Sequence, residues 1–409
     1  MLTLFLIVFV DLVGFGVIIP LLPFYGEHFH ASPLTVGLLM ATYSAAQFLM
    51  APVWGRLSDR IGRRPVLMVS LAGAALAYIG LAFADSLSML FAARVVGGAM
   101  AGNIATAFAY VADITTPANR AKGMGMVGAG FGLGFIFGPA IGGLLAGHDP
   151  ATADYTTPAL VAAGLSMVAL TMTAVWLPES LSAEHRARQA AMPRRDRWQV
   201  LRAALAAPAV ARLIALAFLS TFVFASMETT FAMWSRRHFG WGPEQNGYLF
   251  AYVGVISAAI QGGIVGHLAK RAGEGRLIVA GAAALAVGML LIPFSGGLAG
   301  LAGAMLIVAA GFSLMSPALN SLISLHVDAG VQGATMGVSR SAMTMARVLG
   351  PAWGGAVFAW LGKDWPFYGG ALLMSGVVLL SVLWLPVIGL RQSRASRAQR
   401  IDNATLDED

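Results

Sequence analysis

The sequence G-R-L-S-D-R-I-G-R-R-P, residues 55–65, is a short charged segment between two long apolar runs. Five of its eleven residues are charged, whereas charged residues make up only 11% of the chain. A looser copy, G-H-L-A-K-R-A-G, occupies residues 266–273. The residues that recur, each 211 positions later, are Gly55 as Gly266, Leu57 as Leu268, Arg60 as Arg271 and Gly62 as Gly273. This repetition indicates that the chain consists of two related halves.

The composition is that of a membrane protein. Hydrophobic residues make up 58% of the 409 residues, and the mean hydropathy is +0.75. Soluble domains have about 45–50% apolar and about 25% charged residues. The absence of cysteine excludes disulfides, thiolate metal ligands and cysteine nucleophiles. The basic residues are not gathered on a folded soluble segment, so we expect no nucleic-acid partner.

Twelve apolar runs are long enough to cross a bilayer as helices. They are residues 3–24, 34–55, 65–84, 87–110, 121–146, 158–177, 209–234, 245–267, 276–295, 299–325, 334–361 and 367–390. A second repeat, G-P-A-I-G-G at 138–143 and G-P-A-W-G-G at 350–355, has nearly the same offset as the first. Because six spans per repeat give both copies the same orientation, the halves are related by an axis along the membrane normal. The sequence therefore predicts an all-α polytopic protein with twelve transmembrane helices in two pseudo-symmetric six-helix bundles.

Four segments follow from this division. The N-terminal bundle is 1–177, a linker is 178–208, the C-terminal bundle is 209–390, and a tail is 391–409. The linker is interpreted either as carrying a short amphipathic helix on the membrane surface, around Trp198, Val200 and Leu201, or as a plain basic connection. We expect the polar tail to be disordered.

The distribution of basic residues predicts the orientation. Twenty of the 26 lysines and arginines lie on alternate loops of one side, and only Arg236, Arg237 and Lys363 lie on the other. By the positive-inside rule both termini are cytoplasmic. No cleavable signal peptide is apparent, so the first apolar segment is interpreted as a permanent helix. We expect a multi-pass protein of the inner (cytoplasmic) membrane.

Charged residues inside the spans are candidates for function, because each costs at least about 2.5–3.5 kcal/mol at mid-bilayer. Burial favours the protonated form of a carboxyl group, and a nearby arginine favours the ionised form. Asp11 and Arg94 are therefore the leading candidates for proton coupling. Glu228 is either a second proton site, a group that binds a cationic substrate, or the structural partner of Arg236 or Arg237.

Arg340 and Arg347 lie two helical turns apart on one face of the eleventh span. They either attract an anion into a cavity or neutralise Asp11 or Glu228. Arg340 is close enough to the membrane surface to extend toward water, so Arg347 is the stronger cavity candidate. Uncharged polar residues inside spans serve either a cavity or interhelical hydrogen bonds. They are Tyr43, Gln47, Asn103, Tyr110, Gln261 and Asn320.

The loop at 55–65 carries an acid, Asp59, that the positive-inside rule does not explain. We expect it to act in a gate by capping a helix N-terminus of the other half. Asp113, near the next loop of the same side, is expected to pair with Arg60 or Arg63. The candidate gating residues are Gly55, Asp59, Arg60, Gly62, Arg63, Asp113 and Arg120.

These motifs resemble those of a known family. The loop at 55–65 is similar to the signature loop between helices two and three of the major facilitator superfamily. Residues 11–20, 94–98 and 128–143 resemble the first-helix, intramembrane-arginine and antiporter motifs of its twelve-helix drug:proton antiporters. Together the four motifs are specific to that branch, and within it the sequence resembles the tetracycline-type exporters. The resemblance covers nearly all of residues 1–390.

The resemblance implies proton-coupled efflux, by antiport, of drugs or other amphipathic small molecules through alternating access. The expected partners are a small-molecule substrate, protons and the lipid bilayer, with the proton gradient in place of any cofactor, and the protein is expected to act as a monomer. The antiporter motif is expected to form a packed, kinked interface that seals against proton leak. Its residues are Gly134, Gly138, Pro139, Gly142 and Gly143, with Gly350 and Pro351 in the second half.

The sequence departs from the tetracycline-type exporters at one point. Those proteins carry acids within helices three and nine, whereas 65–84 and 276–295 contain none. Tetracycline is therefore disfavoured as the substrate. The alternative function is a proton-coupled or facilitative carrier of a sugar, amino acid or organic anion, in which Arg94, Arg340 and Arg347 form an anion site. We expect no enzymatic activity, because the seven histidines lack metal-ligand spacing and no phosphate-binding loop occurs.

Overall fold

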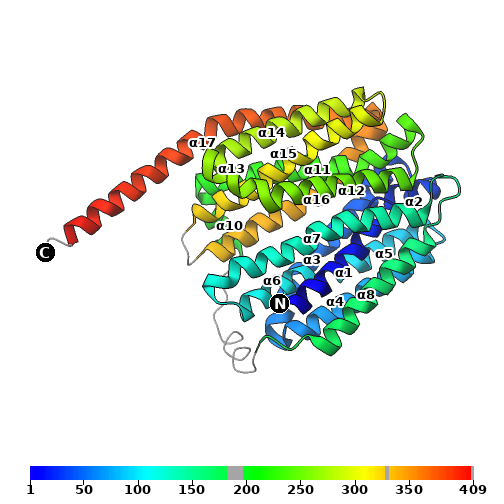
Figure 1. The fold of residues 1–409 in the computed structure, drawn as a ribbon, viewed down its shortest axis with the longest axis horizontal. Helices are drawn as coiled ribbons and strands as arrows, with labels where there is room; N and C mark the ends of the chain where they lie inside the picture. Colours follow the sequence, from blue (N-terminus) through cyan, green and yellow to red (C-terminus); the bar gives the residue numbers. More distant parts are fainter. Residues whose placement is uncertain (182–196, 328–330, 407–409) are drawn as a thin grey trace.

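The computed structural model describes residues 1–181, 197–327 and 331–406. These residues form helices joined by short connections, and no strand occurs among them. Figure 1 shows the helices of the first half, blue to green, packed beside those of the second half, green to red. The all-α prediction is therefore confirmed for the described residues.

The first half contains eight helices. They are α1 (Leu2–Ile18), α2 (Leu22–His28), α3 (Pro33–Ile61), α4 (Arg63–Ala82), α5 (Leu87–Ala99), α6 (Asn103–Ile114), α7 (Pro117–Ala146) and α8 (Thr156–Trp176). The later part begins with α10 (Arg197–Ala206). It continues with α11 (Pro208–Phe239), α12 (Pro243–Ala259), the π-helix η1 (Ile260–Ile264), α13 (Val265–Ala272), α14 (Glu274–Leu291), the 3-10 helix η2 (Ile292–Phe294), α15 (Leu298–Leu325), α16 (Gln332–Leu361) and α17 (Trp365–Leu406).

Eleven segments of the described chain are long and apolar enough to cross a membrane. They match eleven of the twelve predicted spans, so the multi-pass prediction is confirmed while the number twelve remains a prediction. The remaining predicted span corresponds to α16, which is 30 residues long. Its polar residues, which include Arg340, Arg347 and several serines and threonines, lower its hydropathy.

The structure describes part of the predicted linker and part of the predicted tail. Residues 197–206 form the helix α10, where a short helix around Trp198 was one of two interpretations. The preceding part of the linker, 182–196, lies outside the described residues. Residues 391–406, where we expected a disordered tail, continue α17 without a break from the last apolar span. No helix breaker interrupts residues 391–406, where alanine, arginine and glutamine favour helix.

Left-handed glycines form the tight turns between helices. Gly62 (φ 107°) joins α3 to α4, and Gly273 (φ 81°) joins α13 to α14 at the matching place of the second half. Gly147 (φ 93°) and Gly362 (φ 115°) likewise end α7 and α16. Residues with a Cβ rarely adopt such φ values. The internal sequence repeat thus corresponds to a repeated turn geometry.

The two ends of the helix bundle are named here from α3. The basic end is the end with the Gly62 turn, and the far end is the end at which Ser32 begins α3. Asp154 caps α8 at the far end by accepting from the backbone of Thr156 (2.8 Å) and of Thr157 (3.1 Å). A further bond from the Thr157 hydroxyl is the main cause that holds the pKa of Asp154 below its usual value.

Each half has its own apolar interior. The core of the second half surrounds Phe231 and Trp234, and the first half contains two clusters, around Phe24 and Leu67. The halves meet where α3 packs on α16 and α7 packs on α12. The cores lie within the halves apart from Val36 of α3, which packs in the core of the second half, and Ala232 of α11, which packs in the cluster around Phe24.

Candidate functional site

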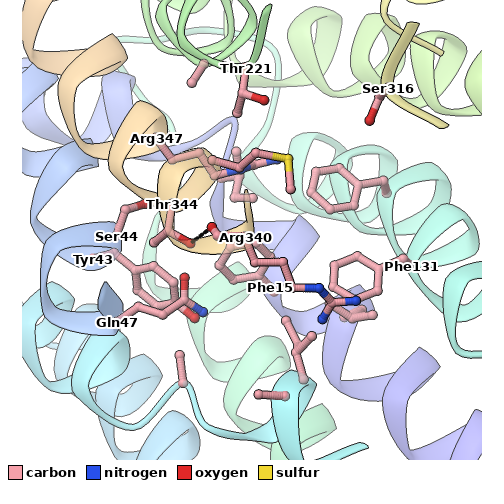
Figure 2. Close-up of a pocket in the computed structure, with 18 of the residues that line it drawn as sticks. Phe15, Tyr43, Ser44, Gln47, Phe131, Thr221, Ser316, Arg340, Thr344 and Arg347 are labelled. Atoms are coloured by element: carbon pink, nitrogen blue, oxygen red, sulfur yellow. Dashed lines mark hydrogen bonds between the residues drawn. The ribbon is translucent and has the colours of Figure 1, made fainter. Parts of the chain in front are cut away.

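A cavity of about 2020 Å³ lies between the two halves. Helices α1, α3, α6 and α7 of the first half and α11, α12, α15 and α16 of the second contribute to its wall. The wall extends from Ile19 and Pro20, toward the far end, to Phe108 and Gly125 near the basic end. Figure 2 shows side chains from both halves directed into this space. Ligand pockets are usually about 300–1,000 Å³, so this cavity is large enough for a drug-sized molecule.

The far end of the cavity is closed by close contact between backbones. Gly37 of α3 lies against the carbonyl of Pro351 in α16, and Gly143 of α7 lies against the carbonyl of Pro243 in α12. A Cβ at either glycine would overlap the facing backbone. The far end therefore closes because these two positions have no side chain.

An ion-pair cluster crosses the same end. The carboxylate of Glu27, in α2, lies 3.0 Å from Arg236 Nη1 and 2.8 Å from Arg237 Nη1, both in α11. The Glu27 side chain is only 8% exposed. The sequence analysis did not identify Glu27, because its position at the end of the first span resembles ordinary surface charge.

At the basic end the wall of the cavity is exposed. Gly125 of α7 and Gly337 of α16, which line the cavity near the basic-end starts of their helices, are exposed. The cavity is therefore open at the basic end and closed at the far end.

Asp11 lies in the cavity wall and is buried. Asn103 Nδ2 donates a hydrogen bond to Asp11 Oδ2, and Ser166 Oγ donates to Asp11 Oδ1 over 3.4 Å. None of the ion pairs among the described residues includes Asp11. The carboxyl group is thus held by neutral donors.

Arg94 lines the same cavity but is not paired with Asp11. Its guanidinium carbon lies 4.5 Å from the centroid of the Tyr43 ring. Its Nε is buried and has no hydrogen-bond partner among the described residues. Arg94 is therefore a buried cation held mainly by an aromatic face.

Glu228 belongs to the cavity rather than to the far-end cluster. Its nearest cation is Arg347, with Nη1 4.0 Å from Oε2. The alternative that Glu228 pairs with Arg236 or Arg237 is wrong, because Glu27 binds both of those arginines. Arg347 therefore faces Glu228 in the cavity wall.

Arg340 also lines the cavity, although we expected it to extend toward the membrane surface. Its guanidinium carbon lies 4.6 Å from the ring centroid of Phe108, in the other half. Figure 2 shows Arg340 and Arg347 extending from the same helix. We expected Arg347 to be the stronger cavity candidate, but both arginines reach the cavity.

The uncharged polar candidates mostly reach the cavity wall. Its lining includes Tyr43, Gln47, Asn103, Gln261 and Asn320. Tyr110 is absent from that lining and donates to the carbonyl of Pro178 over 2.9 Å. Residues that the sequence analysis did not single out also line it, and Figure 2 shows Phe15, Ser44, Phe131, Thr221, Ser316 and Thr344 among them. No sequence signal distinguishes these from lipid-facing or packing residues, because helix rotation decides which face they share.

At the basic end the candidate gating residues meet at Arg63. Its guanidinium donates to Asp113 (2.9 Å), Asp59 (2.7 Å) and Ser58 (2.8 Å). The pairing of Asp113 with Arg63 is as expected. Asp59 also binds Arg63, within its own half, rather than capping a helix of the other half.

The remaining gating candidates lie around this cluster. The carboxylate of Glu179 accepts from the backbone N–H groups of Arg63 (2.8 Å) and Arg64 (3.1 Å), so it caps the N-terminus of α4. The sequence analysis missed Glu179, because a single acid after an apolar span gives no hint of a partner 116 residues away. Arg60 is exposed, Arg120 donates to the carbonyl of Ala112 (3.3 Å), and Gly55 faces open space.

The glycines of the antiporter motif form close interfaces. Gly134 and Gly138 face Leu12 and Gly16 of α1, and Gly142 faces Val17. Across the halves, the Pro139 carbonyl lies against Gly247, next to the contact of Gly143 with Pro243. In the second half Gly350 lies against the carbonyl of Phe222, and Pro351 faces Gly37.

Comparison with known proteins places this geometry among transporters. Residues 4–351 match the family model of the Major Facilitator Superfamily. The chain is 33% identical over 363 residues to the tetracycline resistance protein, class C, of Escherichia coli, covering 87% of this chain and 88% of that one. It is 29% identical over 381 residues to multidrug resistance protein 2 of Bacillus subtilis, covering 92% and 93%.

A solved structure is also similar. The human organic anion transporter MFSD10 (TETRAN) superimposes with a TM-score of 0.71 and 26% sequence identity, covering 93% of this chain and 98% of that chain. Two of these proteins are named for resistance to tetracycline or to multiple drugs, the third is named as an organic anion transporter, and none of the three names describes an enzyme.

Proposed function

We propose that this chain, which belongs to the Major Facilitator Superfamily, exports drugs or other amphipathic small molecules in exchange for protons. As a family member it is a multi-pass membrane transporter that acts on small molecules, and it is not an enzyme. The observation that carries the proposal is the buried carboxyl of Asp11, which has no ion pair among the described residues. It lies in the wall of a large cavity that is open at one end.

The location of the protein follows the basic residues. We place the basic end on the cytoplasmic side of the inner membrane, with both termini there, because most arginines and lysines lie at that end. The cavity then faces the cytoplasm in this structure, and the far-end contacts of Glu27 and Gly37 separate it from the outside. We expect one chain to be sufficient, because the cavity lies between its own halves, and the proton gradient to serve in place of a cofactor.

The proposed cycle couples the two ends of the cavity. A substrate enters from the basic end and binds between the halves. The far-end contacts then separate while the basic end closes, and the substrate leaves. Return of the empty cavity requires a proton on Asp11, and Glu228 is the second proton site of the proposal. Protonation removes a charge whose transfer through the low-dielectric interior would be costly.

The test is Asp11→Asn, which keeps the hydrogen bond with Asn103 but cannot bind a proton at this position. In everted membrane vesicles, drug-stimulated proton release should be lost, while immunoblots show the variant in the membrane at the wild-type level. Wild-type vesicles treated with an uncoupler are the control, because they show the signal expected when no proton gradient drives transport. Wild-type proton release by the variant would refute Asp11 as the coupling site.

A second function is favoured by a separate observation. The charged residues of the cavity wall are three arginines and two acids, Asp11 and Glu228, which is an excess of positive charge. This excess supports a proton-coupled or facilitative carrier of a metabolite. Among sugars, amino acids and organic anions, it favours an organic anion. Uptake of radiolabelled organic anions that rises with an inward proton gradient would favour this function. Drug-stimulated proton release would favour export by exchange.

A further inference from the structure

Most hydrogen-bond donors of the cavity arginines have no partner in the part of the chain that the structure describes. Arg340 has no ion pair among the described residues, and its guanidinium lies over the face of Phe108. Arg94 rests on Tyr43 with a buried, unpartnered Nε. Arg347 has one carboxylate at 4.0 Å, which is beyond hydrogen-bond distance. Because a guanidinium has five N–H donors in a planar fork, these sites have unused capacity for a planar anion.

The charge balance of the cavity favours the same kind of ligand. With both acids ionised the described wall carries a net charge of +1, and with both protonated it carries +3. A cleft with charge of one sign and low-dielectric walls concentrates ligands of the opposite charge. Arg94 is buried with an unpartnered Nε, and a buried charge is costly, so a ligand that neutralises positive charge in the cavity offsets part of that cost.

We propose that Arg340, stacked on Phe108, binds the anionic group of an amphipathic substrate, such as a carboxylate or sulfonate. This inference rests on the proposed function only in that the cavity must be the substrate site. Phe15 and Phe131 of the wall offer aromatic faces to the apolar part of the same molecule. The anion is bound between the halves, because Arg340 belongs to α16 and Phe108 to α6.

An anion at Arg340 also bears on the choice between the two functions. A bound negative charge favours protonated Asp11 and Glu228, and by linkage their protonation favours the anion equally. Anions and protons therefore assist each other's binding, which suits a carrier that moves both in the same direction. A neutral or cationic drug lacks this effect.

The experiment uses three probes of one shape and different charge. They are 2-naphthoate, 2-naphthylmethanol and 2-naphthylmethylammonium. Binding to the purified full chain in lipid nanodiscs is measured by calorimetry at neutral pH, with empty nanodiscs subtracted. The wild-type protein should bind the carboxylate at least about tenfold more tightly than the alcohol, and the ammonium most weakly, because a charged hydrogen bond contributes about 1.5–3 kcal/mol.

Two variants locate the site. Arg340→Gln should weaken binding of the carboxylate about tenfold and leave that of the alcohol unchanged. The matched control is Arg212→Gln, which removes an arginine that also lies over an aromatic ring, that of Trp384 at 5.6 Å, but outside the cavity wall. Arg340→Lys retains the charge without the planar fork and should show an intermediate affinity.

The possible outcomes separate this inference from the proposed export. Equal affinity of the wild-type protein for the three probes would overturn the inference without any variant. So would an Arg340→Gln protein that folds and keeps the preference for the carboxylate. A preference for the carboxylate in a protein that shows no drug-stimulated proton release would support the anion site and reject export by exchange. Drug export without that preference would do the reverse.

Discussion

Glu27 joins the two halves at the far end through both carboxylate oxygens, which lie 3.0 and 2.8 Å from Arg236 and Arg237. The carboxylate is nearly buried, whereas the two arginines are each 40% exposed. Opening of the far end must break both contacts. A pair of charge-assisted bonds in this setting contributes on the order of 1–2 kcal/mol to the closed arrangement.

Glu27→Gln should therefore shift the protein about tenfold toward opening at the far end. The chain has no cysteine, so a single Ile19→Cys reporter near this end of the cavity wall gives an unambiguous signal. We expect an impermeant maleimide added from the far side to label the reporter about tenfold faster in the Glu27→Gln background.

The control for this experiment is Asp85→Asn, which removes an exposed carboxylate in the turn after α4, at the same end. It should leave the labelling rate unchanged. If Glu27→Gln behaves like this control, the cluster of Glu27 with its arginines does not hold the far end closed.

Single residues show where sequence reasoning succeeds. Asp11, Arg94 and Glu228 could be identified because charge inside an apolar span is costly whatever surrounds it. Their partners could not, because Asn103, Tyr43 and Arg347 come from helices far away in the sequence. Acids outside the spans or at their ends, such as Glu27 and Glu179, can contact water. Their charge therefore costs little free energy, and the sequence did not mark them as functional.

At the scale of helices, the far end is closed by glycines that let backbones touch. Gly37 sets the distance between α3 and α16, and Gly143 sets that between α7 and α12. The motif glycines and prolines were expected to form a packed interface, and their contacts with α1, α3 and α12 agree with that expectation. Membrane helices commonly use small residues in this way.

Gly37→Leu should keep the far end from closing, because its side chain would overlap Pro351 and Gly355. We expect transport to fall at least about tenfold, as is typical when a required conformation becomes strained by more than about 1.4 kcal/mol. Rapid labelling of Ile19→Cys from the far side would accompany the loss.

The matched change is Gly164→Leu in α8, where a Cβ meets open space. It should leave transport and labelling at wild-type levels. Full transport by a properly inserted Gly37→Leu protein would show that close contact of α3 and α16 is not needed in the cycle.

Helices themselves were largely predictable, because length and apolarity define a span. The exceptions have physical causes. The predicted span 87–110 is broken between α5 and α6, where the Ser70 hydroxyl accepts from Gly102 N at 2.9 Å in place of a helical bond. Helix α16 was predicted from its length, although its polar side chains keep it out of the set defined by hydropathy. Residues 391–406 continue α17 as helix, although their polarity was taken to indicate disorder.

For the whole molecule, the repeat places equivalent turns at the basic end of each half, but their chemistry differs. The first turn has Asp59, which binds Arg63 at 2.7 Å, and Arg63 also binds Asp113. The second copy has Lys270 at the position of Asp59. One half therefore has a charge cluster around the buried Arg63 at its turn, whereas Lys270 and Arg271 of the other turn form no ion pair among the described residues.

This asymmetry predicts unequal effects on the transport cycle. The cluster of Arg63 fixes α3, α4 and α6 to one another, since Asp59, Arg63 and Asp113 belong to these three helices. The first half must move as a unit when the basic end closes, so loosening the cluster should slow that step. Asp59→Asn should lower transport several-fold, by the roughly 0.5–1 kcal/mol expected for a half-exposed ion pair. Lys270→Ala should change it little.

Transport by both variants is measured in proteoliposomes at equal protein content, with thermal unfolding in detergent as the check on stability. Asp113→Asn extends the series, because its carboxylate is more buried than that of Asp59 (17% against 51% exposed) and should matter more. Equal defects in Asp59→Asn and Lys270→Ala would mean that both turns contribute alike and that the gate follows the symmetry of the repeat. A graded loss from Lys270 to Asp59 to Asp113 would instead place control of the basic end in the first half.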